Sequence, residues 1–75
     1  MIKYFCMNDR ERIGKHISEL RKEKGISQEK LAELSGVGYS HIARIELGRY
    51  SVGIDTLSKI ANVFNCELDF VLIEK

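Results

Sequence analysis

The chain contains no proline and only two cysteines, and what it lacks excludes several kinds of protein. Cys6 and Cys66 lie near opposite ends, and neither they nor the two histidines show the C-x-x-C or H-x-x-x-H spacing of a zinc site. The sequence also has no apolar run of about 20 residues and no signal-peptide pattern. We therefore expect a cytoplasmic protein with free thiols, no metal or other cofactor, and no membrane partner.

Motifs of catalysis are missing as well. The sequence has no recognisable nucleophile–base pair, no paired catalytic carboxylates, no phosphate-binding loop and no dinucleotide fingerprint. It also has no low-complexity run and no repeat at a fixed period. We therefore expect a binding protein and not an enzyme.

What the sequence does contain is the composition of an ordinary small globular domain. Hydrophobic residues make up 44% and charged residues 31% of the 75 positions, which argues against disorder. A chain of this size buries only about 60% of the surface that its unfolded form exposes, so its core is thin, and pairing often adds stability. We expect one domain over residues 1–75, with a helical body over about 9–64.

Charge is distributed unevenly, although the net charge is only +1. Residues 10–24 carry six cations and three anions, whereas residues 65–75 carry three anions and one cation. A basic body with an acidic tail weakly favours one face that meets phosphate. The near-zero net charge argues against a protein that binds nucleic acid by charge alone.

Hydrophobic spacing and capping residues predict four short helices. They cover residues 9–24, 28–34, 39–47 and 54–64. Asn8 or Asp9 can cap the first helix and Ser27 the second, because short side-chain oxygens accept hydrogen bonds from the amides left free at a helix start. Gly25 and Gly48 stand where left-handed residues commonly end helices.

Apolar positions three and four residues apart predict which side of each helix is buried. The predicted core comprises Ile13, Ile17, Leu20, Leu31, Ala32, Leu34, Ile42, Ile45, Leu57, Ile60, Ala61 and Phe64. These residues nearly complete the hydrophobic core of the helical body without any contribution from the ends of the chain.

The two ends differ from the helices. Residues 1–7 and 66–73 are rich in aromatic and branched side chains that partly alternate with polar ones, which is typical of strands. Frayed ends are usually polar, so we expect these segments to form short terminal β-strands that pair with each other and border a dimer interface. For the C-terminal run, a short helix through Leu68, Val71 and Leu72 is the alternative.

A glycine-bearing turn over residues 35–38 joins the second and third predicted helices, and this arrangement is typical of the helix-turn-helix motif. Residues 12–64 resemble the phage-repressor and Cro-type helix-turn-helix family, also called the xenobiotic-response-element family. The resemblance is carried by Gln28, Leu31, Ala32, Gly36, Val37, Ile42, Ile45, Glu46, Gly48, Leu57, Ile60 and Ala61. The chain departs from the family at Gly38, usually a hydroxyl cap, and at Val52, often proline. The resemblance implies a mainly α, lambda-repressor-like fold of four to five helices.

It also implies sequence-specific binding of double-stranded DNA, with residues 39–47 in the major groove. The expected DNA-binding residues are Gln28, Tyr39, Ser40, His41, Arg44, Arg49 and Tyr50. Tyr39, Ser40 and Arg44 are expected at base edges, where arginine can make two parallel hydrogen bonds to guanine and serine can donate or accept one. Each of these residues also has an interpretation that involves no DNA. Arg44 could be an exposed charge on a helix, Tyr39 could pack on its own domain, and His41 could be an ordinary surface residue.

The remaining assignments from the resemblance concern contacts to DNA phosphates and contacts that hold the third helix in place. Gln28 is expected to contact a phosphate and to help position the third helix, although it could simply be a good helix former. Arg49 and Tyr50 are expected to face phosphates. Arg21 is expected to pair with Glu46, joining the first helix to the end of the third.

A single recognition helix covers few bases, so we expect a homodimer on an inverted-repeat operator. Three roles stay open: an autonomous repressor, a restriction–modification controller, and an antitoxin with a cognate toxin as partner. The alternative function is that of a protein-interaction module, for example a coactivator, which keeps the fold without binding DNA. The near-zero net charge supports this alternative.

Overall fold

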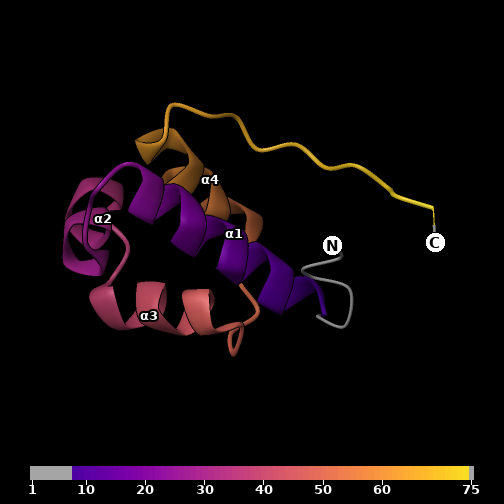
Figure 1. Cartoon of the computed structure of the whole chain (residues 1–75), viewed down its shortest axis with the longest axis horizontal. Coiled ribbons are helices and arrows are strands. Elements are labelled where there is room, and N and C mark those ends of the chain that lie inside the picture. The colour runs from indigo at the N-terminus through magenta and orange to yellow at the C-terminus, as the bar shows by residue number, and fades with distance from the viewer. Residues whose placement is uncertain (1–7, 75) are drawn as a thin grey trace.

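The computed structural model describes residues 8–74, which form four helices and no strand (Figure 1). The helices are α1 (Asp9–Glu23), α2 (Gln28–Ser35), α3 (Tyr39–Leu47) and α4 (Ile54–Val63). The predicted mainly α fold is confirmed, and every helix boundary lies within one residue of its predicted place. No helix in residues 8–74 is both long and apolar enough to cross a membrane.

Side-chain caps explain where α1 and α2 begin. Asn8 Oδ1 accepts a hydrogen bond from the Glu11 amide at 2.9 Å, and the Glu11 carboxylate accepts one from the Asn8 amide at 3.0 Å. Ser27 Oγ accepts a hydrogen bond from the Lys30 amide at 3.0 Å. Each cap satisfies backbone donors that the helix itself leaves free.

The turn between α2 and α3 is built around a left-handed glycine. Gly36 has a φ of +76°, a value that side chains with a Cβ rarely adopt, and its amide donates to the Ala32 carbonyl at 2.9 Å. Ser35 Oγ accepts a hydrogen bond from the Val37 amide at 3.2 Å. Val37 is buried, so this turn anchors the start of α3 to the core.

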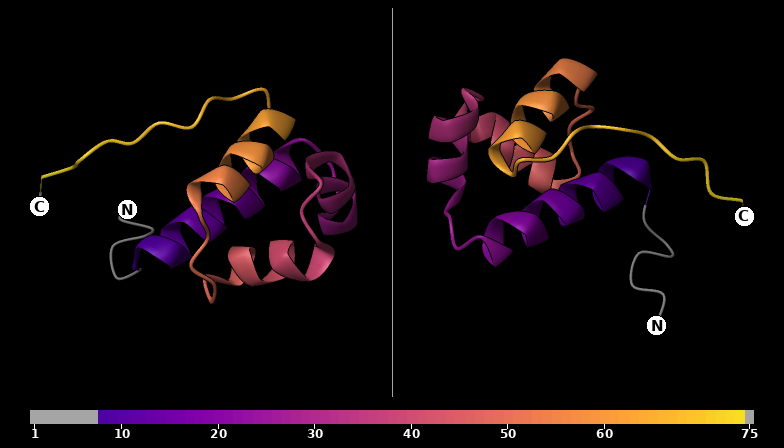
Figure 2. Two further views of the ribbon diagram at one scale, coloured as in Figure 1. Left: turned by 180° about the vertical axis from the view of Figure 1, so that it is seen from behind. Right: turned by 90° about the horizontal axis from the view of Figure 1, so that it is seen from above.

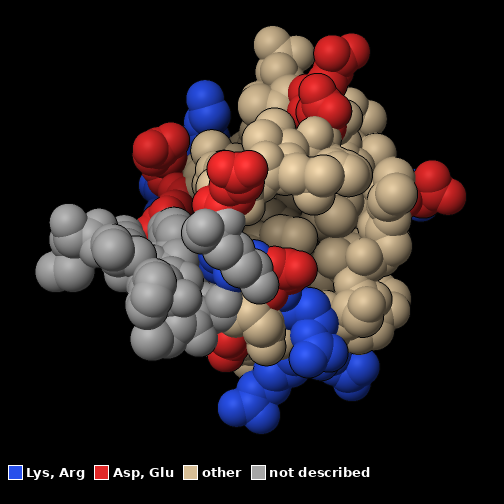
Figure 3. Space-filling model, turned by 90° about the vertical axis from the view of Figure 1, so that its right-hand side faces the viewer, with Lys and Arg blue, Asp and Glu red and all other residues tan. Residues whose placement is uncertain are grey.

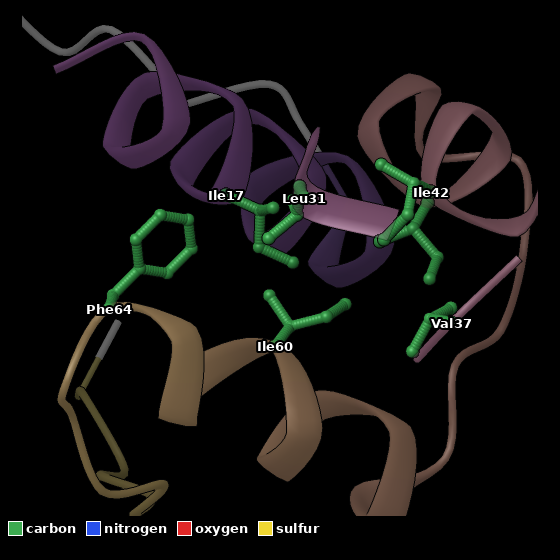
Figure 4. Packing of buried hydrophobic residues seen from close by; sticks show 7 residues of the cluster. Ile17, Leu31, Val37, Ile42, Ile60 and Phe64 are labelled. Atoms are coloured by element: carbon green, nitrogen blue, oxygen red, sulfur yellow. The ribbon is translucent and has the colours of Figure 1, made fainter. Parts of the chain in front are cut away.

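The core is one cluster to which every helix contributes (Figure 4). It consists of Ile17, Leu31, Val37, Ile42, Ile45, Ile60 and Phe64. In the close view of Figure 4, Ile17 of α1, Leu31 of α2 and Ile60 of α4 point toward the same interior. α1 packs against α3, and α2 packs against both α3 and α4. One small core therefore fixes how the four helices are arranged.

Two residues predicted in the core are not there, since Ile13 is 40% exposed and Leu34 is 53% exposed. α2 packs through the side that carries Leu31, Ala32 and Ser35, which are buried or half-buried. Small residues let the neighbouring helices approach on that side, which turns Leu34 toward solvent. Ile13 lies on a side of α1 that faces away from α3, where it lines an open groove.

Beyond α4 the chain continues as the C-terminal arm, residues 66–74. Asn65, with a φ of +58°, turns the chain, and the Cys66 amide donates to the Ala61 carbonyl at 3.0 Å. The arm then runs extended along α1, toward the N-terminal end of that helix (Figures 1 and 2).

The arm forms neither the strand nor the fifth helix considered for residues 66–73. A strand requires hydrogen bonds to a neighbouring strand. Within residues 8–74, no backbone hydrogen bond joins the arm beyond Cys66 to another segment. The partner strand predicted over residues 1–7 lies outside the described residues.

Candidate nucleic-acid interface

The third helix, α3, keeps its apolar and polar side chains on opposite sides. Ile42 and Ile45 are 0% and 2% exposed and belong to the core. The outward side holds Tyr39, Ser40, His41 and Arg44, all of them exposed. Ser40 and Arg44 are four residues apart, so they lie one above the other on the same helix face. Four of the predicted site residues thus share one accessible surface.

The start of α3 is open to a ligand. Gly38 precedes the helix and provides no side-chain hydrogen bond to it. The amides of the first turn are therefore available to water or to a bound group, and the helix dipole favours a negative charge at this position. The helix forms without the hydroxyl cap that is usual in the resembled family.

The loop after α3 is held against the helix. Gly48 ends α3 with a φ of +74°, and the Arg49 amide donates to the Arg44 carbonyl at 3.2 Å. The rings of His41 and Tyr50 stack with their centroids 5.0 Å apart and their planes 29° apart. The exposed Arg49 therefore belongs to a loop segment that its own amide and the neighbouring Tyr50 ring fix to α3.

A single carboxylate joins three helices behind this surface. Glu46 of α3 accepts hydrogen bonds from Arg21 of α1 at 2.7 and 3.1 Å and from Gln28 Nε2 of α2 at 2.9 Å. Arg21 Nη1 also donates to the Ile26 carbonyl at 2.9 Å. The predicted pair between Arg21 and Glu46 is confirmed, and Gln28 bonds directly to the third helix.

Burial makes this network a strong constraint. The side chains of Arg21 and Glu46 are only 12% and 6% exposed. The hydrogen bond to Glu46 raises the pKa of Arg21 above its ordinary value; burial opposes this shift, and the attraction between the two charges adds to it. The guanidinium is therefore permanently charged, and it fixes the carboxylate that orients α3.

The sequence interpretation missed a close approach of α1 to α3. Gly14 is buried in the middle of α1, and a Cβ there would collide with the Ile45 carbonyl oxygen. A Cβ on Gly48 would lie 2.8 Å from the Glu11 Cα. The signal was available, because a glycine inside a helix costs about 1 kcal/mol relative to alanine and usually has a packing reason.

Basic side chains are concentrated toward one edge of the face that Figure 3 shows. In Figure 3, Lys and Arg side chains gather at the lower edge, on the side where α3 lies in Figure 1. The upper part, on the side of α4, is mostly uncharged, with some acidic side chains and a basic one at its left edge. The cationic surface and the polar side of α3 therefore lie toward the same side of the molecule.

Comparison with curated proteins finds several transcriptional regulators among the relatives. The chain is 44% identical over 55 residues to the HTH-type transcriptional regulator PuuR of Escherichia coli, covering 73% of this chain but only 30% of that protein. It is 36% identical over 63 residues to the ImmF control region 10 kDa protein of Bacillus phage phi105, covering 84% of this chain and 70% of the relative.

Solved structures show the same fold. The restriction-modification controller protein C.AhdI of Aeromonas hydrophila superimposes with a TM-score of 0.76 at 37% sequence identity, over 79% of this chain and 89% of that one. A helix-turn-helix family model matches residues 17–71, which contain every residue of the proposed interface. The sequence-based resemblance is thereby confirmed, and the chain belongs to the helix-turn-helix family of transcriptional regulators.

Proposed function

We propose that this chain is a homodimeric regulator of transcription that binds a specific double-stranded DNA sequence through the outward side of α3. The observation that carries the proposal is the separation of the two sides of α3. Ile42 and Ile45 hold it in the core, Glu46 ties it to α1 and α2, and hydrogen-bonding side chains project outward. A rigidly held helix with such an outer face suits the reading of base edges in a major groove.

Base reading is assigned to the outward side of α3. Arg44 can donate two parallel hydrogen bonds to a guanine, and Ser40, one turn earlier on the same face, can donate or accept one. Tyr39, half exposed at the start of the helix, can reach a phosphate with its hydroxyl or place its ring against a thymine methyl.

Phosphate contacts are assigned to residues around that helix. Arg49 supplies a full charge, and the stacking of Tyr50 on His41 holds the phenol beside α3. Gln28 uses one amide hydrogen for Glu46, which leaves its second hydrogen for a phosphate oxygen. The open amides at the start of α3 can bind a further phosphate.

One copy of α3 reaches too few base pairs for high specificity, so the operator should be an inverted repeat bound by two copies. We expect half-sites centred about 10 base pairs apart, or a multiple of that distance. Among the biological roles, a repressor or a controller is favoured by similarity to an immunity repressor of Bacillus phage phi105 and to C.AhdI. An antitoxin role is supported only by the exposed apolar arm, which could meet a toxin.

The test compares two arginines after the operator has been selected from random duplexes. Arg44→Ala should cost about 1–3 kcal/mol of binding free energy and relax the preference at one position of each half-site. Arg49→Ala should weaken binding to all sequences alike and lower the salt slope by about one. Lys59→Ala removes an exposed cation of α4 and is the matched control. It should change neither the base preference nor the salt slope. Identical behaviour of the two arginine variants would contradict the assignment of α3.

The second candidate is a protein-interaction module, favoured by the net charge of +1 and by the exposed apolar arm. The selection experiment discriminates between the two functions. Enrichment of an inverted repeat supports DNA reading, whereas a failure to enrich any sequence at low salt supports the interaction module.

A further inference from the structure

The end of the C-terminal arm exposes a run of apolar side chains. Phe70, Val71, Leu72 and Ile73 are 71%, 77%, 87% and 84% exposed. Single exposed apolar residues are ordinary, but a contiguous patch usually marks an interaction site. The arm is extended, so successive side chains point to opposite sides. An extended segment that is apolar on both sides suits burial on both sides.

An apolar groove lies beside the arm, between α1, α4 and the arm itself. Its volume is about 780 Å³, and its walls include Ile13, Ile17, Leu20, Leu57, Ile60 and Phe70. Figure 3 shows a hollow among uncharged atoms on this side of the molecule. Such a surface gains from being covered by apolar side chains.

We propose that the arm of a second copy of this chain fills the groove, running antiparallel alongside the first arm, and that the second groove receives the first arm in return. This inference deepens the proposed function, because it names the surface through which two copies assemble. Antiparallel pairing results when the two-fold axis that relates the two copies runs perpendicular to the arms. It also gives hydrogen-bond partners to arm amides and carbonyls that lack them within residues 8–74 of a single chain.

The apolar surface available is close to what a specific interface needs. Seven exposed side chains border the arm and the groove: Ile13, Ile54, Leu68, Phe70, Val71, Leu72 and Ile73. At about 60–120 Å² each, they offer on the order of 600 Å² per subunit before the remaining groove walls are counted. A typical specific interface buries roughly 800 Å² per partner.

The position of this surface is compatible with DNA binding. The arm runs beside α1 and α4, whereas α3 lies on the other side of α1 in Figures 1 and 2. Two copies joined through their arms therefore leave both α3 helices uncovered. The acidic arm residues Glu67 and Asp69 also stay away from the cationic side that would face phosphates.

The first test measures association of the full chain without DNA, so its outcome does not depend on operator binding. In sedimentation velocity over a range of micromolar concentrations, the unchanged chain should run as a dimer. The double variant Phe70→Ser/Leu72→Ser should run as a monomer with an unchanged helical circular-dichroism spectrum, because the arm is outside the core. Leu34→Ser/Leu47→Ser, at exposed apolar positions away from the groove, should stay dimeric.

Two results would overturn the inference: a monomeric unchanged chain, or an arm variant that dimerises as well as the control. A second test locates the contact by disulfide cross-linking in a background that carries Cys6→Ser and Cys66→Ser. Val71→Cys, in the arm, should give a covalent dimer on oxidation, whereas Glu33→Cys, at an exposed position of α2, should not. Equal cross-linking at both positions would show that the arms do not meet.

Discussion

Removing Arg21 alone should destabilise this protein more than removing Arg21 and Glu46 together. Arg21 makes two hydrogen bonds to a carboxylate that is only 6% exposed. Without the guanidinium, that carboxylate stays buried with Gln28 as its remaining partner in the network. A buried charge that loses its counter-ion cannot recover in the interior the solvation that water gave it in the unfolded chain.

The expected magnitude is a large share of the total stability. Breaking a buried ion pair from one side costs about 3–5 kcal/mol, and a domain of 75 residues has a free energy of unfolding of roughly 4–11 kcal/mol. Arg21→Ala should therefore leave the protein marginally folded. Arg21→Met/Glu46→Leu replaces the pair by apolar side chains of similar size and should stay within about 1–2 kcal/mol of the unchanged chain.

Urea unfolding followed by circular dichroism measures these differences. With a slope of about 1 kcal/mol per molar urea for a small domain, the single variant should shift the midpoint by several molar, or be largely unfolded in buffer, and the double variant should shift it far less. If the double variant loses as much stability as the two single variants combined, within about 0.5 kcal/mol, the two side chains do not act as a pair and the reasoning fails.

The pH dependence of this pair follows from the raised pKa of Arg21. A group whose pKa is raised on folding stabilises the native state below its unfolded pKa, and it loses that effect only as the pH rises through the folded value. Both values lie beyond the alkaline range in which the protein can be studied. The difference in stability between Arg21→Ala and the unchanged chain should therefore be the same at pH 7 and pH 9.

Four further substitutions test the ends of the helices, each measured by urea unfolding. Gly25→Ala should cost about 1–2 kcal/mol, because its φ is +70° but its Cβ would meet nothing. Gly48→Ala should cost about 1–3 kcal/mol more, because its Cβ would also press on Glu11; equal costs would argue against a tight approach of α1 there. Ser27→Ala should cost about 1 kcal/mol through the lost cap, whereas Gly38→Ser, with open space around its Cβ, should stabilise α3 by about 0.5 kcal/mol. A destabilised Gly38→Ser variant would mean that this helix start cannot use a hydroxyl cap.

Local signals in the sequence predicted the helices well. Asn8 and Ser27 cap the helices they were expected to cap, and Gly25 and Gly48 adopt the expected left-handed conformation. Each of these features depends on interactions within about four residues, which is the range over which a sequence can be interpreted directly.

Features that depend on how helices meet were harder to predict. The exposure of Leu34 follows from which side of α2 its neighbours approach, and the close contact at Gly14 involves a carbonyl 31 residues later in the chain. The pair between Arg21 and Glu46, 25 residues apart, was predicted through the family resemblance and not from the spacing. The conformation of the C-terminal arm was beyond prediction for another reason: an extended apolar segment takes its final form only with whatever covers it.

The division of α3 into a buried and an outward side also bears on how such a protein changes over generations. One set of residues holds the helix in place, such as Ile42 and Glu46, and a separate set projects from it, such as Ser40 and Arg44. Exposed positions usually tolerate substitution within about 0.5 kcal/mol of stability. Under the proposed function, mutations at the projecting positions would therefore change the preferred operator at little cost in stability, while the residues that hold α3 in place stay unchanged.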